Sequence, residues 1–179
     1  AYGAGEIAKR TGSPAAVRTT LQLLHRHRVA PMIGVSSLEE LGARLDAIRG
    51  SLYTPAAGYD GPAPRMGDGV VAIGPYGSLG APDEDKVRRV SEMAAFLDDR
   101  GLFATTDVFL YAADEDCASD VGTRWKAALA ASTASARKVR VGWTCSLAPA
   151  TQPVDVVILP PSMDPAAARA ARAAGRTPW

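Results

Sequence analysis

The stretch Asp107-Val-Phe-Leu-Tyr-Ala-Ala113 is an apolar run that leads directly into three carboxylates, Asp114, Glu115 and Asp116. An apolar run of this length, bounded by polar residues, predicts a strand that is buried on both faces. In parallel α/β folds, functional side chains gather where such strands end. The stretch therefore predicts a central strand with a candidate site at its carboxyl end.

Comparable elements precede and follow this strand. Short apolar runs predict further strands at residues 29–34, 69–74, 139–144 and 154–159, and another strand is expected near Trp179. Between them, apolar residues recur at helical spacing, often after a capping signal such as Ser37 with Glu40. They predict helices at residues 13–28, 37–50, 83–101, 118–135 and 164–175.

The alternation of apolar strands with helices indicates an α/β fold, a parallel sheet covered by helices. Two architectures fit it, a doubly wound open sheet and part of a TIM-barrel-like (β/α)8 fold. A complete barrel needs about 250 residues and eight strands, whereas this chain has 179 residues. We therefore expect residues 1–179 to form a single domain, an incomplete segment of a barrel within a longer chain.

Residues 51–68 interrupt the alternation. They contain Pro55, Pro62 and Pro64, several glycines, and Tyr53 and Tyr59, without any periodicity. They predict a long Pro/Gly-rich loop within the domain, and long loops in compact domains are often functional.

The composition excludes several classes of function. Hydrophobic residues make up 47% and charged residues 22% of the chain, with a net charge of +1. This balance gives no reason to expect nucleic acid or an anionic membrane surface as a partner, and no apolar run suits membrane insertion. The two histidines, His25 and His27, argue against a histidine metal site or a Ser-His-Asp triad and fit the carboxyl end of a helix, where the dipole favours cations. No metal or organic cofactor is expected.

Several candidate residues have a structural alternative. Asp116 can be the N-cap of the next helix, with its acidic neighbours merely solvated. Tyr76, in the Gly-rich segment 74–80, can line a pocket or belong to a plain connecting loop. Trp143 can stack on a sugar or pack in the core. Cys117 and Cys145 follow neighbouring strands, so they can form a disulfide or remain separate buried thiols.

The run Val108–Glu115 resembles the catalytic strand of glycoside hydrolase family 123, in which an Asp-Glu pair follows an apolar, aromatic-containing strand. The segment Leu23–Pro31 is similar to the family's passage from helix to strand, and Thr177-Pro178-Trp179 to the start of a later barrel strand. The resemblance covers roughly residues 15–179 and implies a barrel enzyme that releases terminal β-linked N-acetylgalactosamine or another N-acetylhexosamine. Asp116 stands where the family commonly has proline.

The resemblance also implies a substrate-assisted retaining mechanism, in which the 2-acetamido group of the sugar attacks its own anomeric carbon. Asp114 would orient that group, and Glu115 would act as acid and base. Tyr76, Tyr111 and Trp143 are the candidate substrate-binding residues. A secreted, periplasmic or cell-surface location would follow.

Two other functions stay open at this point. The chain could be a non-catalytic carbohydrate-binding or structural barrel domain of a larger surface protein, or a doubly wound protein that binds a small ligand.

Overall fold

The computed structural model describes residues 13–29, 33–116, 119–144, 153–159 and 165–179. Most helices and strands alternate along this part of the chain. In order they are α2 (Pro14–Arg26), β1 (Ile33–Val35), α3 (Leu38–Ala43), α4 (Leu45–Arg49), β2 (Val70–Ile73), α5 (Glu84–Asp98), β3 (Asp107–Asp114), α6 (Val121–Ala130), β4 (Arg140–Thr144), β5 (Val156–Ile158), α7 (Pro165–Ala173) and β6 (Thr177–Pro178).

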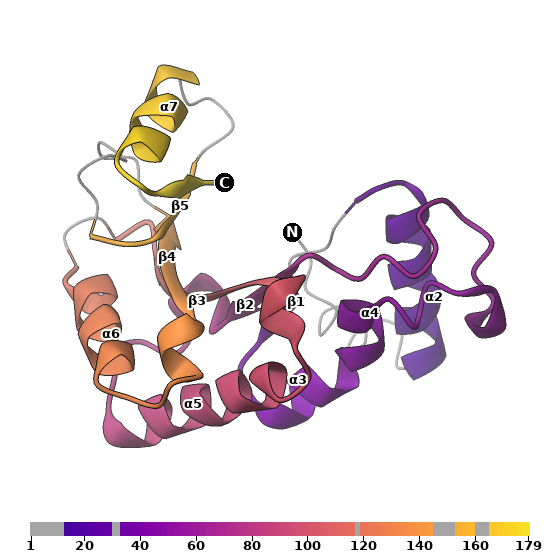
Figure 1. Cartoon of the computed structure of the whole chain (residues 1–179), viewed down its shortest axis with the longest axis horizontal. Coiled ribbons are helices and arrows are strands. Elements are labelled where there is room, and N and C mark those ends of the chain that lie inside the picture. Colours follow the sequence, from indigo (N-terminus) through magenta and orange to yellow (C-terminus); the bar gives the residue numbers. More distant parts are fainter. Residues whose placement is uncertain (1–12, 30–32, 117–118, 145–152, 160–164) are drawn as a thin grey trace.

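All six of these strands form one parallel sheet in the order β1-β2-β3-β4-β5-β6 (Figure 1). The prediction of an α/β fold with a parallel sheet is therefore confirmed. Consecutive strands are neighbours throughout the described part of the sheet, whereas a doubly wound sheet reverses its order at a switch point. The described strands contain no such reversal, so the doubly wound interpretation is wrong for this part of the chain.

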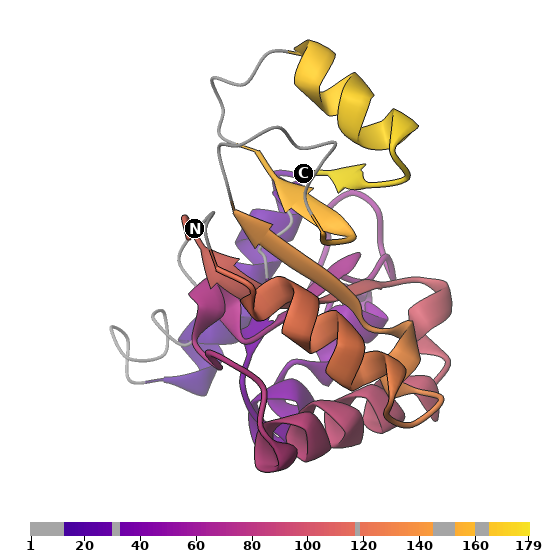
Figure 2. The same cartoon turned by 90° about the vertical axis from the view of Figure 1, so that its left-hand side faces the viewer.

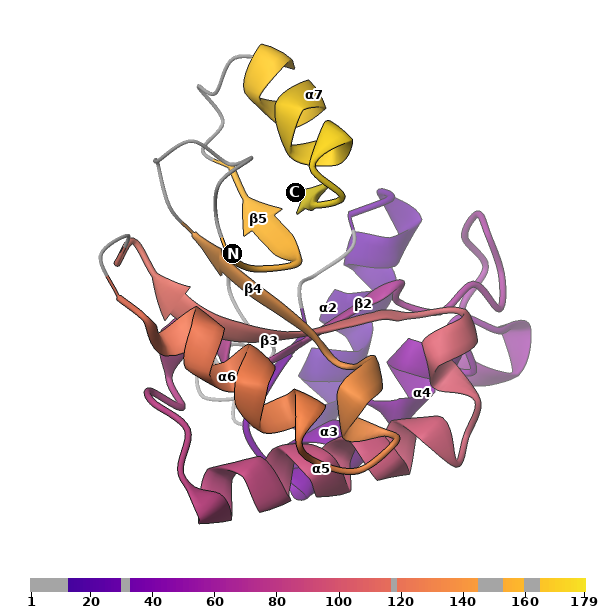
Figure 3. The same ribbon diagram turned by 60° about the vertical axis from the view of Figure 1, so that its left-hand side comes forward.

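Helices α3, α5 and α6 lie along one side of the sheet (Figures 1 and 3). The sequence determines where helix α5 begins. Asp83 caps it by accepting the Lys86 N–H at 2.9 Å, and Glu84 and Asp85 place negative charge in its first turn. Its apolar stripe then faces the sheet and is buried there: Val90, Met93, Ala94 and Leu97.

The opposite face of the sheet has its own smaller apolar cluster, formed by Ala72, Phe109, Tyr111 and Val156. Gly142 makes room for it, because a Cβ there would lie 2.9 Å from the Phe109 ring. Further along the sheet, β5 and β6 follow β4, with α7 beyond them (Figure 2).

A polar network fastens the amino ends of the later strands. Arg140 donates two hydrogen bonds to Asp107, at 2.9 and 3.0 Å, and another to the Thr177 hydroxyl. It also donates to the Asp155 carbonyl at 3.2 Å. This arginine therefore connects β3 and β4 to the start of β5 and to β6 from within the sheet.

Two predicted helices differ from the structure. The helix expected at 37–50 is divided into α3 and α4 at Arg44, whose N–H bonds back only three residues, to Leu41. The helix expected at 118–135 ends at Ala130, because hydroxyl groups beyond it form other hydrogen bonds. Ser132 pairs with Ser91 at 2.8 Å, and Thr133 accepts the Ala136 N–H at 3.2 Å.

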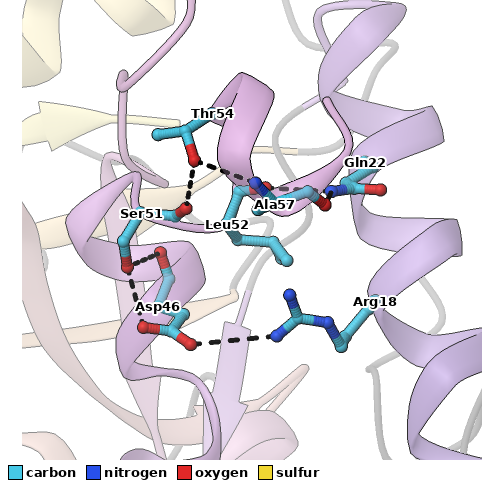
Figure 4. Close-up of polar contacts among 7 residues, drawn as sticks. All are labelled: Arg18, Gln22, Asp46, Ser51, Leu52, Thr54 and Ala57. Atoms are coloured by element: carbon cyan, nitrogen blue, oxygen red, sulfur yellow. Dashed lines mark hydrogen bonds and ion pairs between the residues drawn. The ribbon is translucent and has the colours of Figure 1, made fainter. Parts of the chain in front are cut away.

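The loop at 51–68 is tied to its surroundings. Gln22 of α2 donates to the carbonyl oxygens of Leu52 and Ala57 at 3.0 and 2.9 Å, and Ser51 donates to Asp46 at 2.7 Å (Figure 4). Its two tyrosines are fully buried in the main core: Tyr53 and Tyr59. The loop is thus a packed part of the domain.

Candidate functional site

The carboxyl end of β3 carries an irregularity that determines which side chains meet. Tyr111 is in register with Gly142 and Ala113 with Trp143, so β3 has one extra residue between these pairs. Such a bulge changes which face the following side chains occupy. In a regular strand, residues three apart point to opposite faces. The bulge instead brings Asp114 onto the face of Tyr111.

Tyr111 and Asp114 are joined directly. The Tyr111 hydroxyl donates to Asp114 Oδ1 at 2.6 Å, and the Thr144 hydroxyl lies in hydrogen-bonding contact with the same tyrosine oxygen. Since the phenol has one proton, Thr144 is the donor to Tyr111 in this arrangement. Burial, and then the hydrogen bond to Asp114, raise the pKa of Tyr111, so its hydroxyl stays protonated and can donate.

Glu115 follows Asp114 at the same edge of the sheet. Its backbone N–H donates to the Thr144 carbonyl at 2.9 Å, which holds the end of β3 against β4. Its φ of 55° lies in the left-handed region, which non-glycine residues adopt at an energetic cost and often at functional sites. Both Asp114 and Glu115 are exposed to solvent.

Tyr76 approaches this edge from the loop after β2, which includes the 3-10 turn η2 (Pro75–Gly77). Its ring centroid lies 5.7 Å from that of Tyr111, and its φ of 56° is also left-handed. Gly77 allows the close approach, because a Cβ there would lie 3.1 Å from the Ala113 Cα. Tyr76 is 53% exposed, so its ring can contact a ligand above the Tyr111–Asp114 pair.

Trp143 lies on the other face of the sheet. It is 3% exposed in the main core, and a Cβ at Gly122 of α6 would come within 3.4 Å of its indole ring. The structure therefore brings Tyr76, Tyr111, Asp114 and Glu115 to one edge and separates Trp143 from them, in agreement with its alternative role in the core.

Sequence reasoning missed Thr144. It is the last residue of β4 and is in register with Asp114. Its position at the end of an apolar strand is the signal that could have found it, because neighbouring parallel strands end at the same edge.

The sequence also led to expectations about metal binding, membrane insertion and a disulfide between the two cysteines. Within the described ranges, no group of three or more His, Cys, Asp or Glu residues could hold a metal ion. The helices of the same ranges include none that is long and apolar enough to cross a membrane. Cys117 and Cys145 lie outside the described residues.

The arrangement offers two adjacent carboxylates, a protonated phenol and an exposed aromatic ring. This combination can orient a polar group and transfer a proton beside a ligand that stacks on Tyr76. Comparisons with family models, with curated proteins and with solved structures find no match to this chain. The resemblance to glycoside hydrolase family 123 therefore stays a prediction.

Proposed function

We propose that the chain is an incomplete segment of a (β/α)8 barrel and that it hydrolyses terminal β-linked N-acetylgalactosamine or another N-acetylhexosamine. The observation that carries the proposal is the Tyr111–Asp114 hydrogen bond of 2.6 Å beside Glu115, at the carboxyl end of a central strand. Active sites of barrel enzymes are built at this end.

The sheet supports the barrel part of the proposal. Its strand order follows the chain, as it does in a barrel, and α3, α5 and α6 lie along one side. The face away from these helices is packed with Ala72, Phe109, Tyr111 and Val156. A barrel interior is filled by inward-facing side chains in the same way.

In the proposed reaction, the acetamido oxygen of the sugar attacks its own anomeric carbon and forms an oxazolinium ion. Asp114, oriented by the Tyr111 hydroxyl, holds the acetamido N–H. Glu115 gives a proton to the glycosidic oxygen as its bond to the anomeric carbon breaks. It then takes a proton from the water that attacks this carbon and opens the oxazolinium ring. No enzyme nucleophile is needed, which suits carboxylates that are neighbours in sequence. Tyr76 offers aromatic surface to the sugar, whereas Tyr111, which is 3% exposed, acts through its hydroxyl on Asp114.

The test is the hydrolysis of an aryl β-N-acetylgalactosaminide by the longest form of the protein. Glu115→Gln should lower kcat by about two to four orders of magnitude, as expected for the loss of a general acid–base group. Asp116→Asn is the matched control and should retain activity. An aryl β-galactoside, which lacks the acetamido group, should not be hydrolysed. Equal activity of Glu115→Gln and the unmodified protein would contradict the assignment.

One observation favours a second candidate function, a non-catalytic carbohydrate-binding or structural domain of a larger surface protein. Asp114 and Glu115 are both exposed, whereas a carboxyl group that stays protonated near neutral pH usually needs a desolvated environment. Saturable binding of N-acetylgalactosamine without turnover by the folded protein would support this second candidate. A secreted, periplasmic or cell-surface location is part of either proposal.

A further inference from the structure

An open cavity of about 600 Å³ lies at the amino ends of β2 and β3, the edge of the sheet opposite to Asp114. Its volume is in the range of small-molecule sites. The walls come from the end of α2, from the last part of the loop at 51–68 and from the residues just before the two strands. They include His25, Arg28, Val29, Met66, Asp68 and Thr105.

Asp68 is the unusual group in this cavity, because it is a carboxylate that is only 3% exposed. Its Oδ1 accepts a hydrogen bond from the Tyr53 hydroxyl at 2.9 Å. Its Oδ2 is buried and has no hydrogen-bond partner within the described part of the chain. A buried carboxylate oxygen normally has a donor, so a donor from a ligand would complete the site.

The floor of the cavity is rigidly built. The His25 ring stacks on Tyr53, with centroids 3.7 Å apart and an interplanar angle of 6°. Its Nε2 lies 3.1 Å from the Ala63 carbonyl oxygen, to which it donates. The stacked His25 ring therefore holds the Tyr53 ring, whose hydroxyl donates to Asp68.

The rim adds a cation and an apolar surface. Arg28 is exposed, and none of the ion pairs within the described ranges involves it. Val29 and Met66 are apolar but 49% and 62% exposed. Arg28 and Ala63 also have left-handed φ values of 56° and 52°, a conformation that surrounding contacts must hold in place.

We propose that this cavity binds a free α-amino acid with an apolar side chain. The ammonium group donates to Asp68 Oδ2, and the carboxylate faces Arg28. The apolar side chain lies against Val29 and Met66. An amine without a carboxylate would be repelled by Arg28, and a carboxylate without an amine would meet the charge of Asp68. The site lies apart from Glu115 and does not depend on the proposed hydrolysis.

Three probes separate the contributions of the ammonium and carboxylate groups in an NMR titration of the ¹⁵N-labelled full chain. They are L-leucine, 3-methylbutylamine, which lacks the carboxylate, and 4-methylpentanoate, which lacks the ammonium group. L-leucine should shift the amide signals of Gly67, Asp68, Gly69 and Thr105 in a saturable way. The amine should bind more weakly, and 4-methylpentanoate should not bind. Equal binding of 4-methylpentanoate and L-leucine, or no shift with any probe, would overturn the proposal.

Variants of Asp68 and Arg28 test separately the contacts to the ammonium group and to the carboxylate. Asp68→Asn should weaken L-leucine binding by about tenfold or more, since a hydrogen bond to a charged group is lost. Asp60→Asn removes the same charge from the exposed part of the same loop and should bind L-leucine normally. Arg28→Gln should weaken L-leucine binding but not that of 3-methylbutylamine, a test that remains valid if Asp68→Asn fails to fold. Unchanged L-leucine affinity in Arg28→Gln, or in folded Asp68→Asn, would overturn the proposal.

Discussion

Two tyrosine–aspartate pairs in this molecule have the same chemistry in different surroundings. Tyr111 donates to Asp114 at 2.6 Å at the carboxyl edge of the sheet, and Tyr53 donates to Asp68 at 2.9 Å within the loop at 51–68. Asp114 is exposed, so water solvates the rest of its charge, whereas Asp68 is buried. The Tyr111 hydroxyl therefore orients a carboxylate that water also solvates. The Tyr53 hydroxyl is almost the only group that stabilises the charge of Asp68.

The buried pair shows that one hydrogen bond does not replace water. Burial raises the pKa of Asp68 from its usual value of 3.8 to about 6, although the hydrogen bond from Tyr53 and the charges of His25 and Arg44 act in the opposite direction. Desolvation is the larger effect, as expected for a carboxylate with one unpartnered oxygen. The two pairs should therefore respond very differently to pH and to loss of the tyrosine hydroxyl.

The largest expected effect is a pH dependence of stability that comes from Asp68. A pKa raised on folding means that the folded state binds the proton more tightly than the unfolded state. The stability that this provides is fully present below about pH 3.8 and is lost as the pH rises through about 6. The shift from 3.8 to about 6 corresponds to about 3 kcal/mol. Urea unfolding of the wild type and Asp68→Asn, from pH 4 to 8, measures it. As the pH rises, the unfolding free energy of the wild type should fall relative to that of Asp68→Asn, which cannot lose this proton.

The control for this measurement is Asp60→Asn, because Asp60 is an exposed acid of the same loop. The difference in unfolding free energy between Asp60→Asn and the wild type should stay nearly constant over the same pH range. A parallel pH profile for Asp68→Asn and the wild type would contradict the raised pKa of Asp68.

Removal of the buried hydroxyl should have the next largest effect. Tyr53→Phe keeps the ring that stacks on His25 but deprives Asp68 Oδ1 of its donor. At pH 8 the loss of a hydrogen bond to a buried charge should lower the unfolding free energy by about 2 kcal/mol. The midpoint of urea unfolding, at an unchanged slope, is the measurement. A loss below about 0.5 kcal/mol would show that Asp68 is solvated by another route.

Much of the exposed site could be predicted from the sequence, because strand position alone brings Asp114 and Glu115 to the carboxyl edge. The contact between Tyr111 and Asp114 could not, since a regular strand would separate residues three apart onto opposite faces. It depends on the bulge after Tyr111, which arises from the pairing with β4. The sequence could not decide between the two roles of Trp143, because an indole suits both a sugar and a hydrophobic core. Its place in the core beside Gly122 of α6 depends on tertiary packing, which sequence spacing does not show.

The buried pair was beyond prediction. Proline and glycine content correctly indicated a loop at 51–68, but not that Tyr53 and Tyr59 would be fully buried within it. The packing depends on close backbone contacts that sequence spacing does not show. For example, a Cβ at Gly67 would lie 1.9 Å from the Ile48 carbonyl oxygen. Asp68, which follows directly, is buried as a consequence of that approach.

The smallest expected effect belongs to the Tyr111–Asp114 pair, in which the carboxylate is exposed. Tyr111→Phe should lower the unfolding free energy by about 1 kcal/mol, because water can replace the hydroxyl at Asp114 and only the Thr144 hydroxyl loses a partly buried acceptor. A double-mutant cycle with Asp114→Asn measures the coupling within the pair, which should also be about 1 kcal/mol. If Asp114 orients a substrate, Tyr111→Phe should lower kcat far more than this stability change accounts for. A coupling of about 2 kcal/mol, the loss expected for Tyr53→Phe, would mean that Asp114 is solvated no better than the buried Asp68, and the contrast between the two pairs would fail.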